Sequence, residues 1–269
     1  MGARIAIFNQ KGGTGKTAVT GNLAGALAEL GKSVLVIDLD GQASLTRSLG
    51  LREAVYVDEG DNIYTMLTTL QGDPHTLIQR APHDTFDILP GHYMMFEAAE
   101  SLVAKRNREG RLSRILKTIR KPYDYILVDC PPQRGAISDN ALLACRRVLV
   151  PAEMHEAYMD EVSGLFRQVR ALEGDFDIQI GVVGIVPVAY RGNPDEAAYL
   201  EALRQYRAEW VAPCLRYRRS LMNHARVTGH SIFSYKPPAS HRAKAQRESQ
   251  ADHLALAKFV MQRVEGEAS

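Results

Sequence analysis

The sequence predicts an α/β fold in which a mostly parallel, twisted sheet carries helices on both faces. Short apolar runs, rich in β-branched residues, alternate along the chain with longer stretches of helical periodicity. The strand runs are apolar throughout rather than at alternate positions, which is typical of strands that are buried on both faces of a parallel sheet. No repeat, low-complexity tract or linker interrupts this alternation, so we expect residues 1–269 to form a single domain.

The first strand and the first helix are the clearest of the predicted elements. We expect a strand at Arg4–Phe8 and a helix at Thr17–Leu30. Leu23 and Leu27 lie on one face of that helix, and Gly31 provides the glycine that commonly ends a helix. The segment between the two elements is therefore a strand-to-helix loop.

The later elements are predicted from the same two patterns. The segment 47–85 is the least regular part of the chain, and Pro237-Pro238 separates a last helix from the rest. We expect strands at Ser33–Ile37, Phe86–Leu89, Tyr125–Val128, Val148–Val150, Gln179–Val186 and Val211–Leu215, and helices near 94–119, 136–145, 157–173, 195–209, 219–228 and 240–264.

Composition excludes several classes of protein. Apolar residues make up 45% of the chain and charged residues 24%, which argues against general disorder. The 33 Lys and Arg against 31 Asp and Glu exclude a generally basic nucleic-acid-binding surface but not a local patch. Three well-separated cysteines without a C-x-x-C motif favour neither a disulfide framework nor a zinc site. With no signal peptide and no apolar run near the roughly 20 residues that cross a bilayer, we expect a cytoplasmic protein without membrane insertion.

The loop between the first strand and the first helix is the most informative segment, with the sequence N-Q-K-G-G-T-G-K-T at 9–17. Glycines at this position let backbone N–H groups close around phosphate oxygens at a helix N-terminus. Lys16 would reach the β- and γ-phosphates and the Thr17 hydroxyl would bind Mg²⁺. The strand, the helix and the G-K-T ending together favour phosphate binding over a glycine-rich turn without a ligand.

Two further segments place carboxylates at the carboxyl ends of predicted strands, where open α/β sheets bind ligands. V-I-D-L-D-G-Q at 36–42 carries Asp38 and Asp40. Both can face the phosphate pocket. An apolar strand that ends in Asp129 leads into D-C-P-P at 129–132.

These three motifs resemble those of the deviant Walker A ATPases, which comprise the ParA and Soj partition proteins, the MinD division-site proteins and the nitrogenase iron proteins. The loop has the family's K-G-G-x-G-K-[ST] pattern, including the additional Lys11. The resemblance covers nearly the whole chain, and D-C-P-P looks ParA-like. G-V-V-G-I-V-P at 181–187 resembles the strand whose end borders the adenine. A cluster of the iron–sulfur type is disfavoured because Cys130 directly follows Asp129 and has no cysteine upstream.

The resemblance implies an ATPase that uses ATP and Mg²⁺ and forms a face-to-face homodimer with ATP. In the family, Lys11 would cross to the partner's phosphates and Asp40 would position or polarise the attacking water. Hydrolysis would be slow without a partner, since no arginine stands out for catalysis. This chain departs from the family at two positions: Ala18 stands where the family usually has a hydroxyl residue, and Gly41 stands where partition proteins usually have proline. The implied catalytic residues are Lys11, Lys16 and Asp40, the nucleotide-binding residues are Gly12, Gly13, Thr14, Gly15, Lys16, Thr17 and Pro187, and the Mg²⁺ site is Thr17, Asp38 and Asp129.

Charge is concentrated toward the C-terminal end. Residues 188–264 contain 13 Lys and Arg against six Asp and Glu. Such a region can bind the phosphate backbone of DNA without reading its sequence. By resemblance to partition ATPases, we expect nonspecific DNA binding and hence nucleoid association. The alternative is that these residues form solvated helix faces or intramolecular ion pairs. The predicted DNA-binding residues are Arg216, Arg218, Arg219, Arg242 and Lys244.

Three functions remain open from the sequence. The first is an ATPase that partitions plasmid or chromosomal DNA with a ParB-like, centromere-binding partner. The second is the same ATPase positioning a protein cargo or acting at the membrane, as MinD does through an amphipathic C-terminal helix. An apolar stripe in the last helix, which includes Leu256 and Val260, fits core packing better than lipid binding. The third, a metabolic P-loop ligase, gives no reason for Lys11.

Overall fold

The structure is a computed structural model that describes residues 2–57, 60–237 and 240–266. Of Ser240, His241 and Arg242 it describes the backbone alone. Seven strands form one sheet in the order β3-β4-β2-β5-β1-β6-β7, and all neighbours are parallel except β3 and β4. The strands are β1 (Ala3–Ile7), β2 (Val34–Asp38), β3 (Gln79–Arg80), β4 (Asp87–Leu89), β5 (Tyr125–Asp129), β6 (Arg147–Glu153) and β7 (Gly181–Val188).

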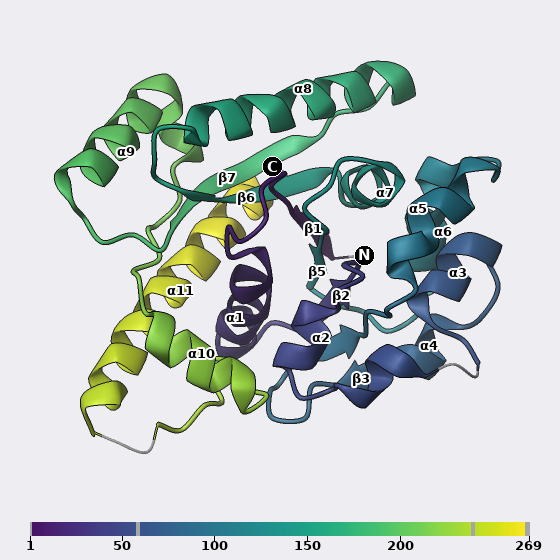
Figure 1. Cartoon of the computed structure of the whole chain (residues 1–269), viewed down its shortest axis with the longest axis horizontal. Helices are drawn as coiled ribbons and strands as arrows, with labels where there is room; N and C mark the ends of the chain where they lie inside the picture. The colour runs from purple at the N-terminus through teal and green to yellow at the C-terminus, as the bar shows by residue number, and fades with distance from the viewer. Residues whose placement is uncertain (1, 58–59, 238–239, 267–269) are drawn as a thin grey trace.

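Helices cover both faces of this sheet, which confirms the predicted fold class (Figure 1). One core layer includes α1 and α11, and the opposite layer includes α5, α6, α7 and α8. The helices are α1 (Lys16–Glu29), α2 (Ser44–Ser48), α3 (Ile63–Thr69), α4 (Pro74–Leu77), α5 (Met95–Val103), α6 (Arg111–Thr118), α7 (Ala136–Cys145), α8 (Tyr158–Phe176), α9 (Pro194–Arg207), α10 (Arg219–Val227) and α11 (Ser240–Gly266).

The central strand β1 shows why its residues are apolar without alternation. Ile5 and Ile7 point into the core layer of α1 and α11, whereas Ala6 and Phe8 point into the opposite layer. All four are fully buried. Successive side chains of a strand face opposite sides, so a strand covered on both faces needs apolar residues at every position.

Two predicted elements differ in the structure. The helix expected near 94–119 is two helices, because α5 ends at Val103 and a 3₁₀ turn at Arg108–Gly110 precedes α6. Asn107 has a φ of 49°, a left-handed conformation that a continuous helix cannot contain. The Asn140 side chain then holds the turn, since its Nδ2 donates to the Arg108 carbonyl (2.7 Å) and its Oδ1 accepts from the Leu112 N–H (3.0 Å).

The strand expected at Val211–Leu215 is wrong. This segment runs beside β7, but the bridges there are the isolated pairs Ile185–Val211 and Tyr190–Arg216. Between them, the Ala212 N–H donates to the Ile185 carbonyl and the Leu215 N–H to the Pro187 carbonyl. The two donors are three residues apart whereas their acceptors are two residues apart, so the register slips and a regular ladder does not form. The irregular segment 47–85 consists of short elements, as its sequence indicates.

The long helix α11 lies along α1 on one face of the sheet (Figure 1). Leu256 and Val260 are fully buried in this packing, and Val264 is 7% exposed. Phe259 is partly buried against the same core. The apolar stripe of the last helix therefore packs on the protein core.

Candidate functional site

The register of three parallel strands brings the predicted motifs to one place. Asp129 at the end of β5 is paired in register with Ile7 of β1 on one side and with Asp38 of β2 on the other. The loop after β1 therefore passes beside both carboxylates. The site lies at the carboxyl edge of the sheet, where ligands bind in open α/β folds.

The loop that joins β1 to α1 is held by its own polar groups. Gly13 and Gly15 have φ values of 81° and 74°, which explains why glycine is needed at both positions. The Lys11 carbonyl accepts hydrogen bonds from Lys16 Nζ (2.8 Å) and Thr14 Oγ1 (3.3 Å). Asn9 anchors the start of the loop, since its Nδ2 donates to the Pro151 carbonyl (2.8 Å).

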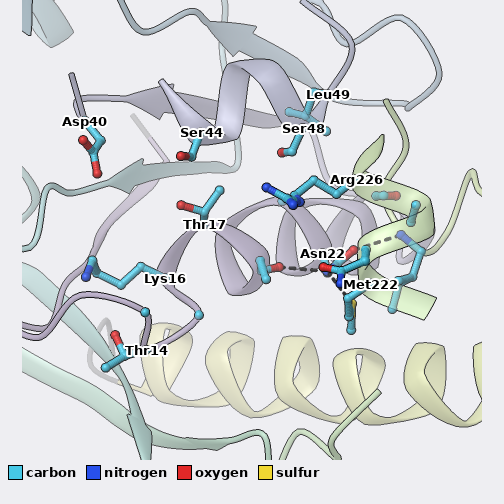
Figure 2. Close-up of a pocket in the computed structure, with 18 of the residues that line it drawn as sticks. Thr14, Lys16, Thr17, Asn22, Asp40, Ser44, Ser48, Leu49, Met222 and Arg226 are labelled. Atoms are coloured by element: carbon cyan, nitrogen blue, oxygen red, sulfur yellow. Dashed lines mark hydrogen bonds between the residues drawn. The ribbon is translucent and has the colours of Figure 1, made fainter. Parts of the chain in front are cut away.

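A cavity of about 570 Å³ opens over this loop. Figure 2 shows Thr14, Lys16 and Thr17 along one side and Asp40, Ser44 and Ser48 along the other, with Asn22 on α1 and Arg226 on α10. Gly12, Gly13, Gly15 and Pro132 also line it. The predicted phosphate-binding residues thus share one cavity with Asp40.

Asp129 is fixed by the first turn of α1. Thr17 Oγ1 donates to Asp129 Oδ2 (2.8 Å), and Thr20 Oγ1 lies 3.3 Å from Asp129 Oδ1 as a second donor. Asp129 is 1% exposed. This contact places the Thr17 hydroxyl between the buried carboxylate and the cavity.

Asp38 is buried and accepts three hydrogen bonds. Thr46 donates both its N–H (2.9 Å) and its hydroxyl (2.7 Å) to Asp38 Oδ2, and the Asp40 N–H donates to Oδ1 (3.2 Å). The Thr46 hydroxyl also accepts from the Gly91 N–H (2.8 Å). Asp38 therefore joins β2, α2 and the segment before α5, while Asp40 faces the cavity.

The electrostatics of the site are dominated by these carboxylates. Burial raises the pKa of Asp38 to about 6, against the lowering effect of its hydrogen bonds from Thr46. Burial, and then the neighbouring Asp38, raise the pKa of Asp129 well above its ordinary value. Burial lowers the pKa of Lys16, while Asp129 opposes this shift. Two adjacent buried carboxylates beside one lysine form a site that a divalent cation would stabilise.

The donor set fits Mg²⁺. The groups present are the Thr17 hydroxyl and the carboxylates of Asp38 and Asp129, all of them oxygen donors. Within the described residues, no group of three or more His, Cys, Asp or Glu side chains is arranged to hold a metal ion by itself. Mg²⁺ commonly keeps water and substrate phosphate among its ligands and takes few from the protein, so this partial set suits it.

Lys11 is turned away from the phosphate loop onto α8. Its Nζ lies 3.1 Å from Glu161 Oε1 and 2.8 Å from His155 Nε2, and its side chain is 44% exposed. The other carboxylate oxygen, Glu161 Oε2, is buried and has no hydrogen-bond partner among the described residues. The side chain that would reach a partner molecule is thus held within its own chain.

Pro187 lies near the site but lines neither of the two cavities that border the phosphate loop. It is buried in β7, and its carbonyl accepts from the Leu215 N–H (2.8 Å). The next two residues, Val188 and Ala189, line a second cavity of about 300 Å³. Gly13, Gly15 and Ala18 border both cavities, so the second space adjoins the phosphate loop.

The predicted DNA-binding residues are separated by the structure. Arg216 pairs with Asp252 of α11 (Nη2 to Oδ1, 2.7 Å), and Arg218 pairs with Glu248 (Nη2 to Oε2, 2.6 Å). Both arginines and Arg219 line the second cavity. Lys244 is exposed on α11. The side chain of Arg242 lies outside the described residues.

Sequence reasoning missed several residues of the site. Ser44, Ser48 and Arg226 line the larger cavity, and His155 and Glu161 contact Lys11. No spacing rule identifies them, because they come from α2, α10, α8 and the segment between β6 and α8, and meet the loop only through packing. Ser44 is the exception, since it follows the D-G-Q motif by two residues.

In the part of the chain that the structure describes, no helix combines the length and the apolar character needed to cross a bilayer. This agrees with the packing of the apolar stripe of α11.

Comparison with known proteins gives a consistent picture. A sequence family described as an AAA domain matches residues 2–182. The chain is 33% identical over 264 residues to the chromosome-partitioning ATPase Soj of Thermus thermophilus, which covers 97% of this chain and 96% of that protein.

Two solved structures are similar in fold. A plasmid partition protein of Borrelia burgdorferi bound to AMPPNP superposes with a TM-score of 0.80 at 18% identity, over 98% of this chain and 100% of that one. Cobyrinic acid a,c-diamide synthase of Mycobacterium smegmatis, with a bound ATP analogue and magnesium, gives a TM-score of 0.73 at 26% identity over 85% and 92% of the two chains.

Proposed function

Because this chain belongs to the Soj/ParA family of P-loop ATPases, we propose that it is a magnesium-dependent ATPase that partitions or positions plasmid or chromosomal DNA. The observation that supports this proposal best is the shared cavity of the phosphate loop and Asp40, with Asp38 and Asp129 beside it. In this proposal residues 1–269 form one ATPase domain. ATP is the substrate, and Mg²⁺ when bound would neutralise charge on its phosphates.

The chain's own residues have distinct roles in this proposal. The N–H groups of Gly12 to Thr17 and the Lys16 ammonium bind the phosphates, while the Thr17 hydroxyl, Asp38 and Asp129 hold the metal and its water. Asp40 faces the cavity and orients the attacking water. The adjoining 300 Å³ cavity beside Val188 and Ala189 receives the base.

Lys11 has to leave α8 to act. In the described conformation Glu161 and His155 hold its Nζ. Its backbone carbonyl accepts a hydrogen bond from the Lys16 ammonium. A bound phosphate would replace that carbonyl as the partner of Lys16. We propose that Lys11 then extends to the phosphates of a second molecule in an ATP-dependent homodimer, where a fixed cation stabilises developing charge.

The ATPase proposal is tested by phosphate release and by equilibrium binding of ATP with Mg²⁺. Lys16→Ala is expected to abolish both, and Asp40→Ala to reduce hydrolysis at least tenfold while ATP still binds. Hydrolysis should need no second substrate, which separates this function from the ligase chemistry that the fold also supports. An absolute requirement for a second substrate would contradict the proposal.

DNA binding is proposed for the basic surface of α11 and its neighbours, in the ATP state and without sequence preference. Lys244 and Arg247 are exposed on that helix and line neither cavity. Arg216 and Arg218 contribute less, because each already pairs with a carboxylate of α11. A ParB-like partner would stimulate hydrolysis, and binding to DNA would place the protein on the nucleoid.

The DNA proposal is tested with random-sequence duplex at two salt concentrations, with ATP, with ADP and without nucleotide. Lys244→Glu/Arg247→Glu should weaken ATP-dependent binding to DNA. It should also make the negative slope of log binding constant against log salt concentration shallower by about 2. Arg167→Glu/Arg170→Glu is the matched control, since this pair is exposed at the same spacing on α8. Equal loss in both variants would contradict a specific surface on α11.

A further inference from the structure

Arg226 occupies a distinctive place in the larger cavity. It is the penultimate residue of α10, and Figure 2 shows its side chain reaching from that helix toward Thr17, beside Ser48 of α2. It lines the same cavity as the phosphate loop. A segment more than 200 residues from the loop in sequence therefore contributes a cation to its cavity.

The guanidinium of Arg226 has no partner in the described structure. Nearby Arg216 and Arg218 pair with Asp252 and Glu248, whereas none of the described residues forms an ion pair or side-chain hydrogen bond with Arg226. Among the residues lining the cavity, the other Lys, Arg, Asp or Glu side chains are Lys16 and Asp40. An unpaired arginine directed into a polar cavity is suited to bind an anion that enters it.

The position along the loop indicates which part of a nucleotide it would meet. Lys16 and Asp40 lie together at one end of the cavity, and Arg226 enters from the other side of Thr17 (Figure 2). Ala18 lines the cavity directly after Thr17 and carries no polar side-chain group. The part of a phosphate chain that lies beyond Thr17 would therefore have no hydroxyl donor at position 18 and would lie near the Arg226 guanidinium.

We propose that Arg226 binds the nucleotide's phosphate chain at its α-phosphate end, opposite the end held by Lys16 and Asp40. This inference rests on the proposed ATPase function, and it adds a nucleotide-binding residue that the loop motif does not contain. The planar guanidinium can donate two parallel hydrogen bonds to one phosphate, which a lysine cannot.

The position of α10 relative to the loop is fixed by hydrogen bonds on both sides. Asn22 of α1 accepts from the Ile232 N–H (2.9 Å), and Asp84 accepts from the Ser231 N–H (3.1 Å). These contacts hold the segment after α10 against α1 and against the turn between β3 and β4. The backbone that carries Arg226 is therefore held beside the loop, while its exposed side chain is ordered only when an anion binds.

The test compares equilibrium binding of ATP and ADP, each with Mg²⁺, by wild-type protein and by Arg226→Ala and Arg226→Lys. Because both nucleotides carry an α-phosphate, Arg226→Ala should weaken ATP and ADP by the same factor, on the order of tenfold or more. Arg226→Lys should recover part of the loss. Arg170→Ala on α8 removes an exposed arginine outside the cavity and should bind as wild type does.

The outcomes are distinguishable. If wild-type protein binds neither nucleotide, or if Lys16→Ala binds as well as wild type, the proposed function itself fails. If wild type binds and Arg226→Ala matches it for both nucleotides, Arg226 is not a binding residue. A loss confined to ATP would overturn the assignment to the α-phosphate end. Thermal unfolding of each variant without nucleotide identifies a loss that arises from misfolding.

Discussion

At the scale of single residues, the contact between Lys11 and Glu161 gives the site a second conformational requirement. The ammonium and Glu161 Oε1 are 3.1 Å apart, and Glu161 is 15% exposed. Any role of Lys11 in a partner's site requires breaking this ion pair. Release removes the lysine from this half-buried carboxylate and leaves His155 Nε2, 3.4 Å from Oε1, as its remaining contact, which opposes release.

Neutralising Glu161 should therefore favour dimer formation. Glu161→Gln is expected to lower the dimer dissociation constant severalfold in the presence of a non-hydrolysable ATP analogue, because Lys11 is then held by hydrogen bonding alone. Sedimentation equilibrium measures this constant. Glu156→Gln, at an exposed position two residues before the start of α8, is the control. Unchanged or weaker dimerisation in Glu161→Gln would contradict the interpretation.

The residues of the site divide by how far the sequence could predict their meeting. Lys16, Thr17 and Asp129 could be brought together from the sequence, because a strand-to-helix loop and a strand-end carboxylate have few possible placements in a parallel sheet. The contacts agree with that placement. Arg226 and Glu161 could not be placed, since their positions depend on how α10 and α8 pack, and short motifs carry no information on this packing.

At the scale of elements, an ion-pair cluster joins β3 and β4 at the edge of the sheet to the segment just before β5. Asp87 on β4 accepts from Lys121 Nζ (2.6 Å), Tyr123 Oη (2.7 Å) and Arg80 Nη1 (3.2 Å). Burial alone would raise the pKa of the Asp87 carboxyl, but these hydrogen bonds outweigh it and leave the pKa below its ordinary value of 3.8. The ionised form thus stabilises the fold.

The sign of the pH dependence follows from that lowered pKa. The contribution of Asp87 is present above pH 3.8, the carboxyl's ordinary pKa, and is lost as the pH falls through its lower value in the folded protein. Asp87→Asn should reduce the free energy of unfolding by about 2 kcal/mol at pH 7. The difference from wild type should shrink below pH 4. Urea unfolding of both proteins at pH 7 and below pH 4 checks this. A difference in the free energy of unfolding that stays constant between the two would contradict it.

The packing of α11 gives a prediction that separates a structural helix from a membrane-binding one. Leu256 is fully buried against the layer that contains α1. Leu256→Ala should lower the free energy of unfolding by about 2–5 kcal/mol. Thermal or urea unfolding measures this loss. Wild-type protein should show no ATP-dependent sedimentation with anionic vesicles. If wild type does bind vesicles, and Leu256→Ala reduces this binding without lowering the free energy of unfolding, the membrane alternative is supported.

Most elements could be predicted from apolar runs and periodicity, and the exceptions have local causes. The strands that are covered on both faces could be predicted from their apolar runs, whereas the edge strand β3 (Gln79–Arg80) is exposed and polar and carries no such signal. Val211–Leu215 has the composition of a strand, but its register against β7 slips by one residue between the Ala212 and Leu215 donors. The break between α5 and α6 depends on Asn107 in a left-handed conformation and on Asn140 from another helix, and the second of these contacts is tertiary.

At the scale of the whole molecule, the larger cavity joins parts of the chain that are distant in sequence. The phosphate loop, α2 and α10 all line it. A ligand bound there contacts all three and has no comparable site in the unfolded chain. Its binding free energy therefore adds to global stability.

Thermal unfolding should show this coupling. Saturating ATP with Mg²⁺ at a hundredfold excess over its Kd adds about 2.7 kcal/mol, which corresponds to a rise in Tm of roughly 5–10 °C for a chain of this size. Differential scanning calorimetry measures the shift. Lys16→Ala should show no rise. A rise that survives this substitution would place the nucleotide elsewhere.

The intramolecular hold on Lys11 has a consequence for evolutionary tuning. In a two-fold symmetric assembly every contact occurs twice, so any change in the energy of the Lys11–Glu161 pair is counted once for each copy. A substitution that changes the release of one lysine by a factor of three therefore changes the association constant by about ninefold. One codon at position 161 could thus set the cellular abundance at which molecules begin to pair, while every residue of the phosphate loop stays the same.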